Sequence, residues 1–172
     1  LKKKKIDKSK EVILVTGTGG GVGGLAVSIL NTLGYNVVAA TSRLSNSEYI
    51  KNLGAKEVIS YDSLLDNKKV LEKEKWGSAI DVLGGNVLDR ICATTKYEGT
   101  VAVCGLASNI KFHTTVFPLI LRGITIVGID SVYRNIKDRI TAWENLSKII
   151  DKNMLLEITK TISLNEVVKY SN

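Results

Sequence analysis

Short apolar runs alternate along the chain with segments whose apolar residues recur at helical spacing. Residues 11–17, 35–42 and 56–62 are short runs that contain valine, isoleucine or threonine, which is typical of strands. Residues 24–34 and 45–55 lie between them and carry apolar side chains three or four positions apart, as amphipathic helices do. The alternation then repeats, with strands predicted at 78–85, 98–107 and 124–132 and helices at 86–96 and 115–123.

The predicted strands are apolar along most of their length, as in residues 100–105. Strands of this kind are buried on both faces, which favours a parallel sheet that is covered by helices and joined by right-handed crossovers. We therefore expect a doubly wound α/β domain, the Rossmann fold, with six or more strands in the order 3-2-1-4-5-6. Beyond residue 132 the pattern is mainly helical and indicates no second domain, so the domain is expected to span residues 11–172.

The net charge of +7 raises the question of a nucleic-acid partner. Six lysines against one aspartate place a charge of +5 in residues 1–10, so the rest of the chain carries only +2. This first segment is expected to be a basic linker. No basic stripe interleaved with aromatic residues follows it, which argues against nucleic-acid binding.

The sequence also bears on location and redox state. No apolar run approaches the length of a membrane span, and no long apolar segment follows the N-terminal lysines as it would in a secretory signal. We therefore expect a cytoplasmic protein without a membrane partner. Cys92 and Cys104 lie in apolar surroundings without the spacing of metal ligands, so both are expected to be reduced core residues.

Six of the twelve residues from Val15 to Ala26 are glycines, and they lie between a predicted strand and a predicted helix. Here glycines allow a tight turn, let backbone N–H groups reach a pyrophosphate and let the helix pack closely on the strand. The helix N-terminus also favours phosphate groups. Three spacings fit the run, GxGxxG, GxxGxxG and TGxxxGxG, so it predicts a dinucleotide site without selecting one family. A Walker loop is excluded, because no Gly-Lys-Ser or Gly-Lys-Thr follows.

The end of the second predicted strand bears on which dinucleotide is bound. An NAD site usually places Asp or Glu there for the ribose 2′-hydroxyl, whereas this strand ends in Thr41, Ser42 and Arg43. Two hydroxyls and a guanidinium suit a 2′-phosphate, which predicts NADP(H). The alternative is that Arg43 is a solvated residue at a helix start. Tyr61 ends the third strand, where it would lie beside the adenosine half or cap the sheet edge.

The TGxxxGxG spacing also requires a test for a short-chain dehydrogenase. Tyr133 and Lys137 have the Tyr-x-x-x-Lys spacing of that class. Its catalytic serine, about a dozen residues before the tyrosine, is missing around Ile120, and LGGN at residues 83–86 replaces the Asn-Asn-Ala-Gly element. A short-chain dehydrogenase is therefore the less favoured interpretation.

Several stretches resemble the cofactor-binding domain of the medium-chain dehydrogenase/reductase superfamily, in the subgroup of acrylyl-CoA reductase and quinone-oxidoreductase-like proteins. They are VTGTGGGVGGLAV, LGAKEVISYD, KWGSAIDVLGG, YEGTVAVCGLA and, most specific to the subgroup, TTVFPLILRGITIVGIDSV. The chain departs from the subgroup's usual serine at Gly19, glycine at Ser42 and frequent arginine at Tyr61. His113, where the subgroup tends to have proline, is expected to be a loop residue.

The resemblance assigns roles around the cofactor. The residues that would face the pyrophosphate through their backbone are Gly19, Gly20, Gly21 and Val22. The 2′-phosphate would be held by Thr41, Ser42 and Arg43. The nicotinamide half would lie in a crevice lined by Leu106, Ile120 and Ser131. No residue of the chain is assigned a catalytic or metal-binding role.

Members of the resembled family begin with a β-rich catalytic domain that supplies most of the substrate site and end with a further strand, and neither lies in these 172 residues. We therefore expect the NADPH-binding domain of a zinc-independent oxidoreductase that transfers hydride to an activated alkene, such as an enoyl thioester, quinone or enone. The chain alone is expected to be inactive and to form a homodimer through an edge strand at 123–132. The alternative is a non-catalytic cofactor-binding remnant or the product of a split gene.

Overall fold

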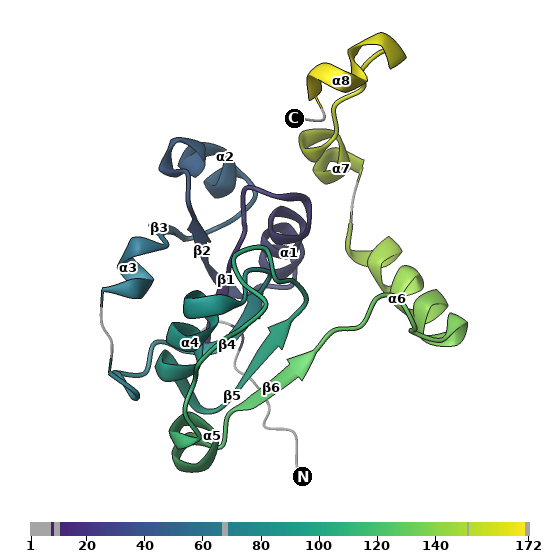
Figure 1. Ribbon diagram of the computed structural model, residues 1–172. Coiled ribbons are helices and arrows are strands. Elements are labelled where there is room, and N and C mark those ends of the chain that lie inside the picture. The colour runs from purple at the N-terminus through teal and green to yellow at the C-terminus, as the bar shows by residue number, and fades with distance from the viewer. Residues whose placement is uncertain (1–7, 9–10, 67–68, 151, 171–172) are drawn as a thin grey trace.

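One parallel sheet of six strands organises the chain up to residue 128 (Figure 1). The computed structural model describes residues 8, 11–66, 69–150 and 152–170. The strands lie in the order β3-β2-β1-β4-β5-β6, and all five pairings are parallel, which confirms the predicted Rossmann topology. They are β1 (Val12–Val15), β2 (Asn36–Thr41), β3 (Glu57–Ser60), β4 (Trp76–Asp81), β5 (Thr95–Val103) and β6 (Thr125–Gly128).

Helices connect the strands at nearly the predicted places. Within the sheet region they are α1 (Gly21–Thr32), the 3₁₀ helix η1 (Leu44–Asn46), α2 (Ser47–Asn52), α3 (Asp62–Leu65), α4 (Gly85–Thr94) and α5 (Phe117–Arg122). The helix α1 begins three residues earlier than predicted, because the last glycines of the turn already belong to its first turn. The short α3 was not predicted, and β6 is shorter than the predicted strand at 124–132.

The sheet is buried on both faces, as its apolar strands require. On β1, Leu14 belongs to one buried cluster and Val15 to the other, since successive side chains of a strand point to opposite faces. The Val15 cluster is completed by residues of α1 and α2, among them Val27 and Ile50. The Leu14 cluster is completed by residues of α3 and α4, among them Leu64, Val87 and Ile91. The crossover from β3 to β4 thus changes the face that the helices cover, which makes the sheet doubly wound.

Four further helical elements follow the sheet. They are α6 (Ile136–Ile149), α7 (Lys152–Ile158), the 3₁₀ helix η2 (Leu164–Glu166) and α8 (Val167–Tyr170). Figure 1 shows the chain leaving the sheet after β6, and α6 has no buried residue, but Ile158 at the end of α7 packs against the Val15 cluster. Within the described ranges, no helix combines the length and the apolar character that a membrane crossing requires. The basic linker predicted at residues 1–10 lies, apart from Lys8, outside the described residues.

The two cysteines differ in burial. Cys92 on α4 is buried, and this burial raises the pKa of its thiol to about 12. Cys104 is exposed, so the prediction of a core position was wrong for this residue. It comes directly after the last residue of β5, and its N–H donates to the Asp81 carbonyl oxygen at 2.9 Å, next to the last residue pair of β4 and β5. The apolar sequence pattern thus continued one residue past the buried strand.

Candidate cofactor site

A cavity of about 310 Å³ opens at the carboxyl ends of β1, β2 and β4. This edge is where a doubly wound sheet binds ligands. Six of the predicted cofactor residues line the cavity, namely Gly19, Gly20, Thr41, Ser42, Arg43 and Tyr61. The other lining residues are Gly17, Asn46, Val82, Leu83 and Ala107. None of these eleven side chains is acidic and one is a cation, which suits an anionic ligand.

The glycines of the turn fall into two groups. Gly17 has φ +66°, and a methyl group on Gly23 would overlap the Gly17 carbonyl and lie 2.8 Å from the Thr16 oxygen. These two glycines are required by the turn and by the packing of α1 against β1. Gly19 and Gly20 have no such internal reason, since a methyl group there would make only ordinary or slightly tight contacts. Both are exposed at the cavity, where the lack of a side chain leaves room for a ligand.

The N-terminus of α1 is open toward this turn. Gly20 is the N-cap residue, no side chain caps the helix, and the first turn contains no acidic residue. Gly21 and Val22 are exposed, so packing does not cover the first two residues of the helix. The first N–H groups of a helix have no partner inside it and carry partial positive charge. The end of α1 therefore offers the donors that a phosphate group binds.

The turn after β2 presents the predicted polar side chains. The Arg43 N–H donates to Thr41 Oγ1 at 3.1 Å, which holds the turn in shape. Ser42 and Arg43 are exposed, and both line the cavity. Among the described residues, no carboxylate forms an ion pair with Arg43. Its guanidinium is thus available to an anionic group.

A buried carboxylate that the sequence analysis missed joins the ends of β1 and β4. Asp81 is fully buried, and its Oδ1 accepts from Thr16 Oγ1 at 2.7 Å. It also accepts from the N–H groups of Leu83 at 3.3 Å and Gly84 at 2.8 Å. Thr16 Oγ1 in turn accepts from the Val82 N–H at 3.0 Å. These bonds compensate the buried charge and fix the turn after β4 beside the glycine turn. An acidic residue at the end of an apolar run was the available signal.

The loop after β5 forms the wall nearest to β4. Three consecutive N–H groups, at residues 107–109, donate to the carbonyl groups of Val82 and Leu83 at 2.8 to 3.2 Å. A methyl group on Gly105 would overlap the Val82 carbonyl, so the two loops need a glycine there to approach. Leu106 lies in this loop with 63% of its surface exposed, next to the cavity residue Ala107. The loop can therefore present Leu106 to a ligand that extends past the cavity.

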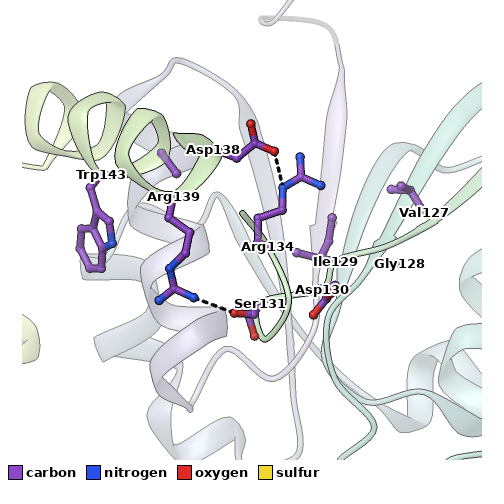
Figure 2. A pocket seen from close by; sticks show the side chains of 10 residues that line it. Val127, Gly128, Ile129, Asp130, Ser131, Arg134, Asp138, Arg139 and Trp143 are labelled. Atoms are coloured by element: carbon purple, nitrogen blue, oxygen red, sulfur yellow. Dashed lines mark hydrogen bonds and ion pairs between the residues drawn. The ribbon is translucent and has the colours of Figure 1, made fainter. Parts of the chain in front are cut away.

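Two predicted residues lie away from this cavity. Ile120 is 72% exposed on α5. Arg122 of the same helix donates to the Thr95 carbonyl at the beginning of β5, so α5 lies near the amino end of this strand, whereas the cavity lies at the carboxyl ends of the strands. Ser131 lines a second cavity of about 480 Å³, between the end of β6 and α6, where its carbonyl accepts from Arg139 at 3.0 Å (Figure 2). The described residues thus do not bring Ile120 and Ser131 into one crevice with the glycine turn, and their contact with a cofactor stays a prediction.

Comparison with known proteins decides the family. The family model described as zinc-binding dehydrogenase matches residues 21–150. The chain belongs to the zinc-binding dehydrogenase family. Its similarity to quinone-oxidoreductase and acrylyl-CoA reductase relatives confirms the resemblance that the sequence analysis identified.

The similar proteins include curated sequences and solved structures. YhfP of Bacillus subtilis, named as a candidate quinone oxidoreductase, is 43% identical over 163 residues, 94% of this chain and 49% of YhfP. The acrylyl-CoA reductase AcuI of Ruegeria pomeroyi is 36% identical over 156 residues, 90% of this chain and 47% of AcuI. The Salmonella enterica oxidoreductase YhdH, solved with NADP, has a TM-score of 0.90 at 38% identity, over 95% of this chain and 50% of YhdH. The structure of Bacillus subtilis YhfP with NAD has a TM-score of 0.89 at 41% identity, over 96% of this chain and 51% of YhfP.

This member of the zinc-binding dehydrogenase family spans about half the length of the curated relatives it matches. Within its described residues, no group of three or more His, Cys, Asp or Glu side chains could hold a metal ion. The residues present therefore do not fit the zinc of the family's description, and zinc independence stays a prediction. Tyr133 is 89% exposed, and neither it, Lys137 nor His113 lines the cofactor cavity.

Proposed function

We propose that this chain is the NADP(H)-binding half of an oxidoreductase. The observation that carries the proposal is the cavity between the open N-terminus of α1 and the Thr41-Ser42-Arg43 turn, which has one cation and no acidic residue in its lining. The NADP in the structure of the similar YhdH protein supports the same cofactor here. The NAD in the YhfP structure makes the choice between the two dinucleotides the point to test.

The residues present fit the two anionic parts of NADP(H). The exposed glycines 19–21 leave the backbone accessible, so their N–H groups and the end of α1 would hold the pyrophosphate. Arg43, with the hydroxyl groups of Thr41 and Ser42, would hold the 2′-phosphate. Leu106 would contact the nicotinamide half. When bound, the cofactor supplies a hydride, and this chain's part is to orient the donor ring and limit water around it.

The names of the relatives support a hydride acceptor with an activated double bond. AcuI is an acrylyl-CoA reductase, and YhfP is named as a candidate quinone oxidoreductase. We propose that the whole protein reduces an enoyl thioester, quinone or enone, and that a β-rich domain outside this chain supplies most of the substrate site. Among the described residues that line the cavity, we assign none as a general acid or base for that reaction.

The chain alone is expected to bind NADPH but to turn over no substrate. Binding uses groups that are predicted to lie between Val15 and Ser131, whereas hydride transfer needs the acceptor held close to the nicotinamide with water excluded. The test is to titrate the purified chain with NADPH and then follow NADPH oxidation with acrylyl-CoA and simple quinones. Binding with background rates is expected. Saturable turnover by the chain alone would mean that the active site lies within it, and absence of NADPH binding would overturn the proposed function.

We also propose a homodimer through β6, which is an edge strand of the sheet. An edge strand leaves its outer N–H and C=O groups unpaired, and the exposed Val127 and Ile129 add apolar surface beside them. Sedimentation at micromolar concentration is expected to give a dimer, and Val127→Lys is expected to shift it to monomer because a charge on the edge opposes pairing. A wild-type monomer would contradict this arrangement.

A further inference from the structure

The side chain of Tyr61 reaches across the floor of the cofactor cavity. Tyr61 follows β3, and its hydroxyl oxygen accepts from the Gly17 N–H at 3.0 Å, just beyond the end of β1. Since β2 lies between β3 and β1, the ring must span the end of β2 to make this bond. Its main chain is also tied to β2, because the Tyr61 N–H donates to the Thr41 carbonyl at 3.2 Å. Tyr61 thereby connects the ends of three neighbouring strands.

Gly17 passes this connection on to the helix that faces the phosphates. The Gly17 carbonyl accepts from the Gly20 N–H at 2.9 Å, and the Gly20 carbonyl accepts from the Gly24 N–H at 2.9 Å inside α1. Gly20 is the N-cap of α1. A series of hydrogen bonds therefore runs from the Tyr61 hydroxyl through the glycine turn to the first turn of α1. At its far end are the N–H groups that would bind the pyrophosphate.

The surroundings of Tyr61 favour a fixed position for its ring. The ring packs against the buried cluster that contains Leu14 and Ala40. Burial raises the pKa of the phenol above its usual value of 10, with a smaller contribution in the same direction from Asp81, while the Gly17 N–H lowers it. The hydroxyl thus stays protonated at neutral pH and serves Gly17 as a neutral acceptor. A glycine turn alone has no side chains with which to hold its own shape.

We propose that Tyr61 is a positioning residue whose hydroxyl holds the glycine turn, and with it the N-terminus of α1, in the conformation that binds the pyrophosphate of a dinucleotide. This inference rests on the proposed function. It differs from a contact role in the adenosine half, because the effect acts on the pyrophosphate, which NADPH and NADH share. Tyr61 therefore sets overall dinucleotide affinity, and Arg43 sets the preference between the two.

Tyr61→Phe separates these roles, because it keeps the ring and removes only the acceptor of Gly17. Dissociation constants for NADPH and NADH are measured by titration calorimetry at a temperature where every variant is folded. Both are expected to rise about fivefold to tenfold, because the turn loses its fixed geometry, with their ratio unchanged. Wild-type affinity for both cofactors would overturn the positioning role, and a loss for NADPH only would make Tyr61 a 2′-phosphate ligand instead.

Thr95→Val is the matched control for general destabilisation. Thr95 is fully buried at the beginning of β5, where its hydroxyl donates to the Ile91 carbonyl at 2.7 Å, so the substitution also removes one buried side-chain hydrogen bond to the backbone. It is expected to leave both dissociation constants within twofold of wild type. An equal loss of affinity in Thr95→Val would reduce the Tyr61 effect to a structural one.

A measurement without ligand keeps this inference distinct from the proposed function. Hydrogen exchange of the Gly17 amide is expected to be slow in the unliganded wild-type chain and at least tenfold faster in Tyr61→Phe, because the substitution removes its acceptor. An unchanged exchange rate of the Gly17 amide would overturn the positioning role of the Tyr61 hydroxyl even if NADPH binds. Failure of the wild-type chain to bind either dinucleotide would overturn the proposed function, whatever the exchange rates show.

Discussion

Replacing Gly23 with alanine is expected to destabilise the folded chain by about 3 kcal/mol or more. Gly23 is buried in the first turn of α1, and a methyl group there would overlap the carbonyl of Gly17 and approach that of Thr16 to 2.8 Å. These are backbone atoms of the turn and of the end of β1, which cannot rotate away as a side chain can. Relief requires α1 to move off the sheet, and overpacking of this kind costs about 1 to 3 kcal/mol or more. Since a domain's whole stability is about 5 to 15 kcal/mol, the variant loses a large fraction of it.

Gly21→Ala is the matched control, two residues earlier in the same helix. A methyl group on Gly21 would meet nothing within 4 Å. Alanine is favoured over glycine in a helix by about 1 kcal/mol, so this variant is expected to be as stable as wild type or slightly more stable. Denaturant unfolding monitored by circular dichroism measures both effects. If Gly23→Ala unfolds at the wild-type denaturant concentration, α1 does not pack on β1 as described.

This pair of variants also shows what the glycine run does and does not predict. Three spacings fitted the sequence, and each assigned the glycines differently. The structure distinguishes the individual glycines by the space around them, because Gly17 and Gly23 have no space for a side chain, whereas Gly19 and Gly21 do. At Gly23 the clashing atoms are backbone atoms of the turn, and at Gly17 the clashing atom belongs to the Val82 side chain, which follows β4. Both positions depend on how the helix and the neighbouring strand dock. A spacing rule carries no information about that docking.

The fold itself could be predicted almost completely from local patterns. Strands that are apolar on both faces, separated by helices, allow few arrangements other than a doubly wound parallel sheet. The errors occur at the ends of strands, where the apolar sequence pattern extends beyond the residues that are buried or paired in the sheet. Cys104 continues an apolar run but lies beyond the buried part of β5, and residues 129–132 continue the pattern of β6 beyond its last sheet residue.

The site was predicted less completely than the fold, because parts of it depend on contacts between distant residues. Arg43 could be found from the end of one strand alone. The bond from Tyr61 to Gly17 joins residues 44 positions apart, and the bond from Thr16 to Asp81 joins residues 65 positions apart. Both depend on which strands are neighbours, and on the reach of one particular side chain across them. Sequence patterns indicated the strand ends without indicating these cross-links.

Arg43→Ala is expected to weaken NADPH binding about tenfold to a hundredfold while leaving NADH binding within about twofold of wild type. Arg43 is exposed at the cavity, and none of the described carboxylates pairs with it, so its guanidinium can bind the 2′-phosphate without first breaking an ion pair. Hydrogen bonds to charged groups contribute about 1.5 to 3 kcal/mol, which corresponds to one to two decades in the dissociation constant. NADH lacks that phosphate and gains nothing from the guanidinium.

Arg134→Ala controls for the loss of a positive charge. Arg134 is also an exposed arginine, but it lies on the second cavity and pairs with Asp138 at 3.0 Å (Figure 2). Its removal lowers the net charge equally, so long-range attraction of the anionic cofactor changes in both variants, whereas only Arg43→Ala removes a direct contact. Titrations of both variants with NADPH and NADH in the same buffer give the four ratios needed. Two results would contradict a contact between Arg43 and the 2′-phosphate. One is that Arg43→Ala weakens the binding of NADPH and NADH equally, and the other is that Arg134→Ala has as large an effect as Arg43→Ala. The cofactor preference would then depend on other residues of the cavity.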